Sequence, residues 1–279
     1  GTGIGRPEAA RVLANGSEAQ GDWWLDRGLH YGDGLFETLR CRNGRPAWFD
    51  LHCARLQLGC QRLGIEPPDA GTLRDEAARL LGASGEGILK IIMTRGRARA
   101  RGYRPARDEV PTRLLLFYPG PQVQVTPLRL GHASTTLSCN RLLAGIKHLN
   151  RLEQVLAQRE AASQGVDEVL MDTPDGRTIC GSLSNLFVLR GNELATPPVD
   201  DCGVAGIVRS RVLVLAERAG LRACVRQPGR DELDAATSLY LGNVRRGFQA
   251  VDCYRGRNLA TDGRCERLRG LIEAEADAT

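Results

Sequence analysis

Apolar and polar positions in the first half of the chain alternate between strand-like and helix-like patterns. Leu51, Leu58 and Leu63 recur at helical spacing behind Asp50, a candidate N-cap, and Gly64 ends this helix. A second helix is expected over residues 72–81, and a glycine- and arginine-rich loop precedes the last strand. Strands are predicted over residues 11–13, 35–41, 46–49, 88–94 and 113–118, with tight turns at 15–16 and 43–44.

The second half follows a proline-glycine cluster at residues 119–121, which is the best candidate for a linker between domains. Strands turned by hairpins and interrupted by single helices favour an α+β fold over a doubly wound parallel sheet. We therefore expect a smaller N-terminal α/β domain over residues 1–119 and a larger C-terminal domain over 120–279. The elements expected in the second half are a strand over 123–130, a helix after residue 150, two hairpins within 168–194, a helix near 206, a strand over 238–242, a hairpin near 256 and a C-terminal helix.

A lysine lies between a glycine turn and a helical pattern, in the segment LAGIKHLNRLEQ. Asn150 is the expected N-cap, Glu153 occupies a capping-box position, and Gly165 ends the pattern. Lys147 would then lie on the loop over residues 143–150, here called the lysine loop, beside apolar neighbours. Desolvation there would lower its pKa and favour the neutral amine that Schiff-base chemistry requires, although a lysine before a helix is usually an ordinary surface residue.

Composition and charge narrow the class of protein. A formal net charge of +5 is mildly basic, and the arginines are scattered except between residues 95 and 107, with no aromatic platform among them. A basic cleft for an anionic small molecule explains this charge as well as nucleic-acid binding does. Nine cysteines without a CxxC pair suggest neither a disulfide framework nor a cysteine zinc site, and no metal is expected. Without a long apolar run or a signal-peptide pattern, we expect a cytoplasmic protein with no membrane partner.

A candidate phosphate site occurs in the segment GVAGIVRSRVLVLAERAG. Gly203 and Gly206 allow a close turn, and a helix would begin at Ile207 and Val208 with amides free to face a phosphate. The other interpretation is an ordinary glycine turn before an amphipathic helix.

The string IKHLNRLEQV resembles the active-site segment of the aminodeoxychorismate lyase family, fold-type IV enzymes of folate synthesis that use pyridoxal 5'-phosphate (PLP). DRGLHYGDGLFETLR, residues 26–40, resembles the N-terminal signature of fold-type IV. The resemblance runs from about Leu25 to Val251, with the motifs in the family's order. It implies a pseudo-barrel-like C-terminal domain, PLP carried by Lys147, and a homodimer whose loops complete each other's sites.

The resemblance also assigns roles to further positions. Arg101 and Tyr103 match an R-G-Y ending that binds a substrate carboxylate in related enzymes, and Thr38 would line the substrate site with Phe36. Glu37 is open to a structural or a functional role. The residues that the resemblance places at the PLP phosphate are Arg55 of the H-x-x-R-L helix with His52 and Leu56, Ile207 and Val208 of the glycine turn, and Asn243 and Val244 after the strand SLYLGN.

One position departs from the family pattern. Cys180 stands where most fold-type IV enzymes have a glutamate facing the pyridine nitrogen of PLP, and the motif that follows, Asn185 to Phe187, matches well. A neutral thiol stabilises a protonated pyridine far less than a carboxylate does. Transamination should suffer most, whereas an elimination driven by aromatisation of the product needs less help from the ring.

The resemblance therefore implies a PLP-dependent lyase that converts 4-amino-4-deoxychorismate to p-aminobenzoate and pyruvate, with Lys147 as the catalytic base. A D-amino-acid or branched-chain aminotransferase of the same fold is the first alternative. A non-catalytic PLP-fold protein that acts as a binding module is the second, prompted by Cys180.

Overall fold

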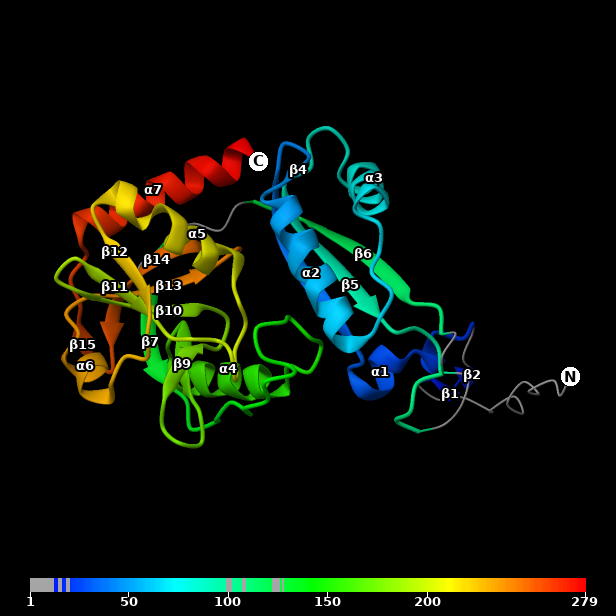
Figure 1. The fold of residues 1–279 in the computed structure, drawn as a ribbon, viewed down its shortest axis with the longest axis horizontal. Coiled ribbons are helices and arrows are strands. Elements are labelled where there is room, and N and C mark those ends of the chain that lie inside the picture. The colour runs from blue at the N-terminus through cyan, green and yellow to red at the C-terminus, as the bar shows by residue number, and fades with distance from the viewer. Residues whose placement is uncertain are drawn as a thin grey trace, which may run out of the picture.

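The computed structural model describes residues 13–14, 17–18, 21–98, 102–106, 109–121, 126 and 128–279 (Figure 1). These residues form two larger sheets flanked by helices, and a short pairing of β1 (Leu13–Ala14) with β2 (Ser17–Glu18). The α+β class predicted from the sequence is confirmed.

The N-terminal sheet is antiparallel, with strand order β4-β3-β5-β6. Its buried positions alternate along β3 and β5, so that Leu35, Leu39, Leu89 and Ile91 form a core with helices α2 and α3. The elements of this half are η1 (Trp23–Leu25), α1 (Arg27–Tyr31), β3 (Gly34–Arg42), β4 (Arg45–Pro46), α2 (Phe49–Leu63), α3 (Ala70–Leu81), β5 (Gly87–Thr94) and β6 (Thr112–Pro119).

The C-terminal sheet closes into a barrel, as the resemblance implied. The ladder runs β10-β13-β14-β7-β8-β9 and returns to β10 through the pairing of Asn185 with Cys180. Leucine, valine and tyrosine side chains from these strands fill a core that includes Leu186, Leu241 and Tyr254. The strands are β7 (Leu128–His132), β8 (Glu168–Asp172), β9 (Thr178–Gly181), β10 (Asn185–Arg190), β13 (Leu239–Asn243) and β14 (Gly247–Tyr254), with β11 (Glu193–Thr196), β12 (Arg222–Val225) and β15 (Arg257–Asn258) extending the sheet.

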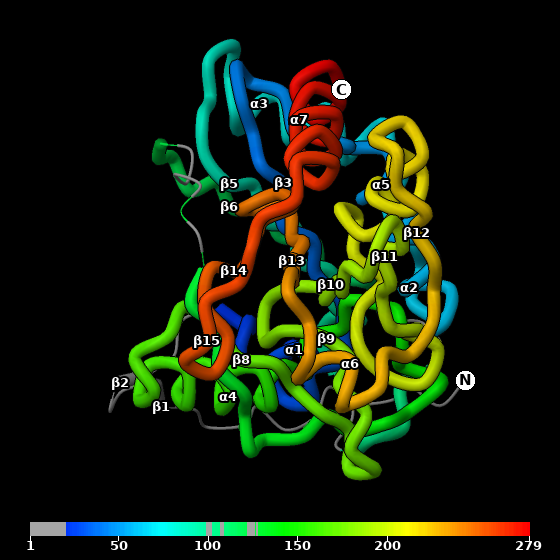
Figure 2. Tube along the Cα trace, turned by 90° about the vertical axis from the view of Figure 1, so that its left-hand side faces the viewer, coloured from blue at the N-terminus to red at the C-terminus, as the bar shows by residue number. Residues whose placement is uncertain are grey.

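Helices cover the outside of the barrel. Helix α4 (Leu152–Gln164) packs against β8, and α5 (Ile207–Leu215), η2 (Ala216–Ala219) and α7 (Gly263–Ala278) share one apolar cluster, while α6 (Arg230–Ala235) precedes β13. The C-terminal end of α7 lies beside the N-terminal sheet (Figure 2). There Glu273 pairs with Arg40 at 2.8 Å, and Glu275 accepts a hydrogen bond from the Trp48 indole at 3.1 Å. The last helix therefore ties the two sheets together.

The N-terminal sheet ends with β6 at Pro119, and the barrel begins with β7 at Leu128. A division of the chain into domains at residues 119 and 120 is consistent with this arrangement and stays a proposal. Part of the predicted strand over 123–130 lies outside the described residues. Within the described part of the chain, no helix is long and apolar enough to cross a membrane.

Both predicted helix caps are wrong, for a common reason. Helix α2 starts at Phe49 behind Trp48, so Asp50 lies in its first turn and the strand predicted over 46–49 is only β4. Helix α4 starts at Leu152, and the Asn150 amide instead donates to the Gly32 carbonyl at 3.1 Å. The Glu153 carboxylate accepts hydrogen bonds from Ser138 rather than closing a capping box. In each case the side chain that was expected to cap a helix forms an ion pair or a hydrogen bond with a residue elsewhere in the chain, Arg74 in the case of Asp50.

Candidate active site

The lysine loop lies between the N-terminal sheet and the barrel. Its backbone pairs with the start of β3, since the Phe36 amide donates to the Lys147 carbonyl at 2.9 Å and Leu149 donates to Gly34 at 3.0 Å. The Lys147 Nζ atom stands 4.4 Å from the centre of the Phe36 ring. Burial, and next the Arg55 cation, lower the pKa of Lys147 to about 7. A large fraction of this amine is therefore neutral at neutral pH, as predicted from the apolar neighbours.

Lys147 opens into a cavity of about 710 Å³ between β3, the barrel and helix α4. The lining combines apolar surface with convergent polar groups, which is typical of a small-molecule site. The predicted site residues that line this cavity are Thr38, Arg55, Lys147, Cys180, Ile207, Asn243 and Val244.

The N-terminus of α5 lies at the cavity wall. Gly206 is the N-cap of α5 and makes no side-chain cap hydrogen bond, and both Gly206 and Ile207 line the cavity. A Cβ atom at Gly206 would lie 2.0 Å from Asn185 Oδ1, so the turn needs glycine at this position. Val208 is buried in the core and does not line the cavity, so only its backbone could take part. Free amides at a helix N-terminus form an anion site.

Arg55 is held at the edge of the glycine turn by a buried network. Its guanidinium pairs with both oxygens of Glu37, at 2.8 and 2.5 Å, and donates to the Ala205 carbonyl at 2.9 Å. Glu37, only 1% exposed, also lies 2.6 Å from Nδ1 of His52. Burial alone would raise the pKa of Glu37, but the Arg55 cation and His52 lower it to about 2. Strand alternation explains the arrangement, because Glu37 faces α2 while Phe36 and Thr38 face the cavity.

Cys180 lies near the C-terminal end of β9, in the cavity wall. Burial, and next the Glu168 carboxylate, raise the pKa of Cys180 to about 12, so its thiol stays neutral at physiological pH. Arg151 also lines this cavity, and its guanidinium donates to the His148 carbonyl at 2.9 Å. The neutral thiol expected from the sequence is thus what the surroundings of Cys180 favour.

Several cations on the cavity wall were missed from the sequence. Arg151 follows Lys147 by four residues, and the double arginine after Val244 gives two more positive charges beyond the end of β13. Both signals lie beside residues that had been singled out. The cationic and amide side chains on the wall that were not predicted are Arg151, Gln154, Gln158, Arg159, Arg245 and Arg246.

The sequence predicts two residues that bind a substrate carboxylate, and the structure describes only one of them. Arg101 lies outside the described residues. Tyr103 is 85% exposed and does not line the cavity. Its carbonyl accepts a hydrogen bond from the buried Arg27 at 2.7 Å, which anchors the backbone of this loop while leaving the phenol in solvent. Within one chain, the predicted contact of Tyr103 with the site is therefore absent.

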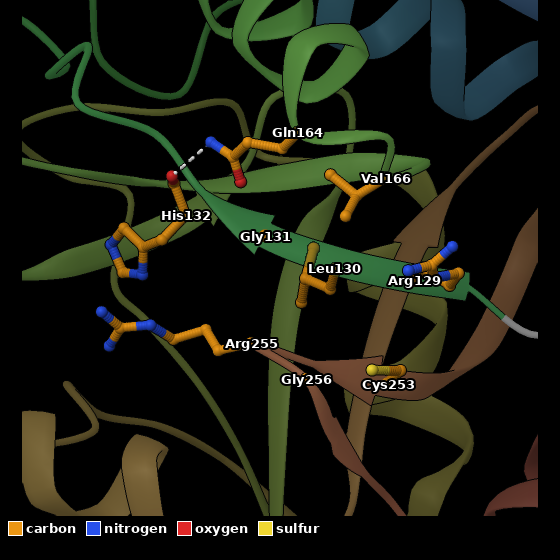
Figure 3. A pocket seen from close by; sticks show the side chains of 9 residues that line it. All are labelled: Arg129, Leu130, Gly131, His132, Gln164, Val166, Cys253, Arg255 and Gly256. Carbon is orange, nitrogen blue, oxygen red and sulfur yellow. Dashed lines mark hydrogen bonds between the residues drawn. The ribbon is translucent and has the colours of Figure 1, made fainter.

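A second cavity, of about 420 Å³, lies beside β7 and the turn that follows β14 (Figure 3). Two of its lining residues are hydrogen-bonded, since the Gln164 amide donates to the His132 carbonyl at 2.9 Å (Figure 3). None of the residues predicted for catalysis or binding line it, so we place the candidate site in the larger cavity.

The residues of the larger cavity fit PLP. A lysine amine of lowered pKa can attach a carbonyl group, the amides at Gly206 and Ile207 with Arg55 can hold a phosphate, and the Cys180 wall can face a ring. The fit rests on the donor set and on the space that glycine leaves in the turn.

Comparisons with known proteins identify the family of this chain. A family model described as amino-transferase class IV matches residues 34–253. The aminodeoxychorismate lyase of Vibrio harveyi is 30% identical over 230 residues, covering 81% of this chain and 84% of that protein. The D-alanine aminotransferase of Bacillus licheniformis is 28% identical over 239 residues, covering 85% and 84%. The crystal structure of 4-amino-4-deoxychorismate lyase from Pseudomonas aeruginosa superposes with a TM-score of 0.83 at 38% identity, covering 91% of this chain and 94% of that one.

The family match spans most of the chain and includes every predicted residue that lines the larger cavity. This chain belongs to the class IV aminotransferase family of fold-type IV, PLP-dependent enzymes.

Proposed function

We propose that this protein is a PLP-dependent lyase that converts 4-amino-4-deoxychorismate to p-aminobenzoate and pyruvate. The observation that carries the proposal is the pairing, in one cavity, of a Lys147 amine with a pKa near 7 and a Cys180 thiol that stays neutral. The similarity to the lyases of Vibrio harveyi and Pseudomonas aeruginosa supports it.

Lys147 would act twice on protons in this reaction. Bound PLP supplies an electrophilic carbonyl for the substrate amine and a ring that withdraws electrons from the adjacent carbon. Lys147 Nζ, neutral near pH 7, removes the proton from the amine-bearing ring carbon of the substrate. Enolpyruvate leaves as the six-membered ring becomes aromatic, and the same Nζ returns its proton to the enolpyruvate methylene to give pyruvate. One amine can serve as base and acid because its pKa lies near the working pH.

The substrate's two carboxylates match the positive wall of the cavity. Arg151, Arg159, Arg245 and Arg246 bring four guanidinium groups to the side of the cavity formed by α4 and the end of β13. Guanidinium groups bind carboxylates in a bidentate manner, so these arginines favour a dicarboxylate substrate over a neutral one. Thr38 adds a hydroxyl on the opposite wall, on β3.

Cys180 favours elimination over amino transfer. Amino transfer would rely on a protonated cofactor ring as an electron sink, and a neutral Cys180 thiol facing the ring would support this less than a carboxylate would. An aromatising elimination draws its driving force from the product instead. An aminotransferase acting on D-amino or branched-chain acids is the second candidate, supported by the similarity to the D-alanine aminotransferase.

The two candidates are separated by a two-product assay. Purified protein is given PLP and aminodeoxychorismate formed in situ, and pyruvate and p-aminobenzoate are both quantified. Equal yields that depend on this protein support the lyase. Amino transfer from D-alanine or leucine to 2-oxoglutarate, without those products, would support the aminotransferase. Binding of PLP with neither reaction would support a non-catalytic binding protein.

The Lys147→Ala variant tests the assigned base. It should lose covalent attachment of PLP and all turnover, because no other amine is expected to replace Nζ. Lys90, whose Nζ stands 5.4 Å from the same Phe36 ring, provides the matched control Lys90→Met. That variant should retain covalent PLP, detected by mass spectrometry after borohydride reduction. Normal turnover in Lys147→Ala would contradict the assignment.

We also propose a homodimer, supported by apolar side chains that the single chain leaves uncovered. Leu142 and Leu152 are 74% and 71% exposed, and the neighbouring Val155 is more than half exposed. Large apolar groups gathered beside an active site are typical of a subunit interface. Light scattering should give about twice the mass of the chain, and Leu152→Asp should shift the population toward monomer. A monomer of normal activity at micromolar concentration would contradict this proposal.

A further inference from the structure

Two cysteines from distant parts of the chain meet beside the glycine turn. Cys139 precedes the lysine loop, and Cys202 immediately precedes Gly203. The sulfur atoms of Cys139 and Cys202 and a carboxylate oxygen of Asp201 all lie within 4.8 Å of one another. The residue after Cys139 and the residue before Cys202 are joined by a hydrogen bond from the Asn140 amide to the Asp201 carbonyl at 2.8 Å. The two sulfurs thus face each other across a backbone contact that is already formed.

This contact lies where the segments of the cavity wall converge. The Gly145 amide of the lysine loop donates to the Gly203 carbonyl at 3.0 Å, and the Ala205 amide donates back to Gly145 at 2.9 Å. Asp201 also pairs with Arg177, which precedes β9, at 2.8 Å. A covalent link at this point would join the loop that carries Lys147 to the turn that begins α5.

We propose that Cys139 and Cys202 form a reversible disulfide that clamps the lysine loop to the glycine turn, with a low-molecular-weight disulfide as the oxidant. The two sulfurs need to approach from within 4.8 Å to about 2 Å, which side-chain rotation and a small backbone shift can supply. Neither cysteine belongs to the proposed lyase chemistry, so this site is independent of the reaction that the enzyme catalyses.

The exposure of the two cysteines determines which thiol reacts first with the oxidant. Cys139 is exposed, whereas Cys202 is 2% exposed and its thiol donates to Asp201 Oδ1 at 3.4 Å. Burial, and next the Asp201 carboxylate, raise the pKa of Cys202, so it cannot be the thiol that reacts first. The Cys139 thiolate attacks glutathione disulfide and expels one glutathione thiolate. Cys202 then loses its proton to solvent and attacks the Cys139 sulfur, which expels the second glutathione as its thiolate. The protein loses two electrons and two protons, and one glutathione disulfide becomes two thiols.

The test uses the full chain loaded with PLP and equilibrated in buffers of different glutathione to glutathione-disulfide ratio. Free thiols are blocked in acid, and a non-reducing peptide map is read by mass spectrometry. We expect a linked peptide pair that contains residues 139 and 202 and disappears when dithiothreitol is added. Cys139→Ser should abolish the pair, while the control Cys253→Ser, at a half-buried cysteine of β14, should leave it unchanged.

Thermal unfolding gives a second readout of the clamp. A disulfide between residues 139 and 202 closes a long loop of the chain, so oxidation should raise the Tm of the wild type by roughly 2–6 °C. Cys139→Ser should show no such change in Tm on oxidation. Glutathione held on Cys139 with Cys202 still reduced would overturn the proposal, as would an absence of any linked pair. A linked pair with a lowered Tm would overturn the clamp, because the bond would then be distorting the contact that it joins.

Discussion

Replacement of Glu37 by glutamine tests whether the network behind the cavity holds Arg55 in place. Glu37 is almost fully buried and accepts three charge-assisted contacts from Arg55 and His52. Its pKa in the folded protein is about 2, against an ordinary value of 4.5. At about 1.4 kcal/mol for each pKa unit, this difference corresponds to about 3 kcal/mol of stability at neutral pH. Removal of one partner from a buried ion pair costs about 3–5 kcal/mol, which agrees.

The pH dependence of this loss has a definite sign. A carboxyl whose folded pKa is lowered contributes its full stability above about pH 4.5, and the contribution is lost as the pH falls through about 2. The difference in free energy of unfolding between wild type and Glu37→Gln should therefore shrink from about 3 kcal/mol at pH 7 to about half of that near pH 3. Urea unfolding followed by tryptophan fluorescence measures both values.

Asp50→Asn is the matched control, because it removes an arginine-paired carboxylate from α2, the helix that carries Arg55. Asp50 pairs with Arg74 at 2.5 Å, but its side chain is 82% exposed, so the change should cost less than about 1 kcal/mol. The reasoning is refuted if the two variants lose the same stability. It is also refuted if the gap for Glu37→Gln is constant between pH 7 and pH 3.

Three further predictions concern the cavity. The rate at which the Lys147 amine of PLP-free protein reacts with trinitrobenzenesulfonate should rise with pH, with an inflection near pH 7 instead of pH 10.5. An inflection above pH 9 would contradict the assigned burial of this amine. Gly206→Ala should weaken PLP binding on the order of tenfold or more, since its Cβ would lie 2.0 Å from Asn185 Oδ1, whereas Gly229→Ala, with no atom within 4 Å, should bind PLP normally in a fluorescence titration. Cys180→Glu should raise the ratio of amino transfer to elimination on the order of tenfold, and an unchanged ratio would remove Cys180 from the choice of reaction.

The elements that the sequence predicted well are those with strong local signals. Helix α5 begins directly after Gly206, α2 ends at Gly64 in a left-handed conformation, and hairpins occur across residues 168–194 as expected. The site residues were found through motifs, and those that line the cavity come together although they are distant in the sequence. Closure of the barrel was implied only by the resemblance, because a single pairing between Asn185 and Cys180 closes it and periodicity cannot indicate that pairing.

The predictions that failed depended on partners far along the chain. Asn150 and Glu153 read as caps locally, yet Gly32 and Ser138 take their hydrogen bonds. The large apolar residues of α4 are mostly exposed, and the residues that α4 buries are the small Ala157 and Ala161. A helix whose small residues face the core can lie close to β8, and its leucines are left for another surface.

Arg55 shows how one side chain can join a structural role to a functional one. Its pairing with Glu37 favours a structural role for that carboxylate, which the sequence left open, because both oxygens of Glu37 are engaged on the side of β3 that faces α2. The same guanidinium reaches the Ala205 carbonyl next to the glycine turn, and its charge is the second cause of the lowered pKa of Lys147. An arginine fixed in this way can favour an anion at the turn and a neutral amine at the lysine simultaneously. Since Glu37 opposes the second effect, Glu37→Gln should move the Lys147 inflection below pH 7 even as it destabilises the fold. A shift in the other direction would show that Arg55 leaves the site when its partner is removed.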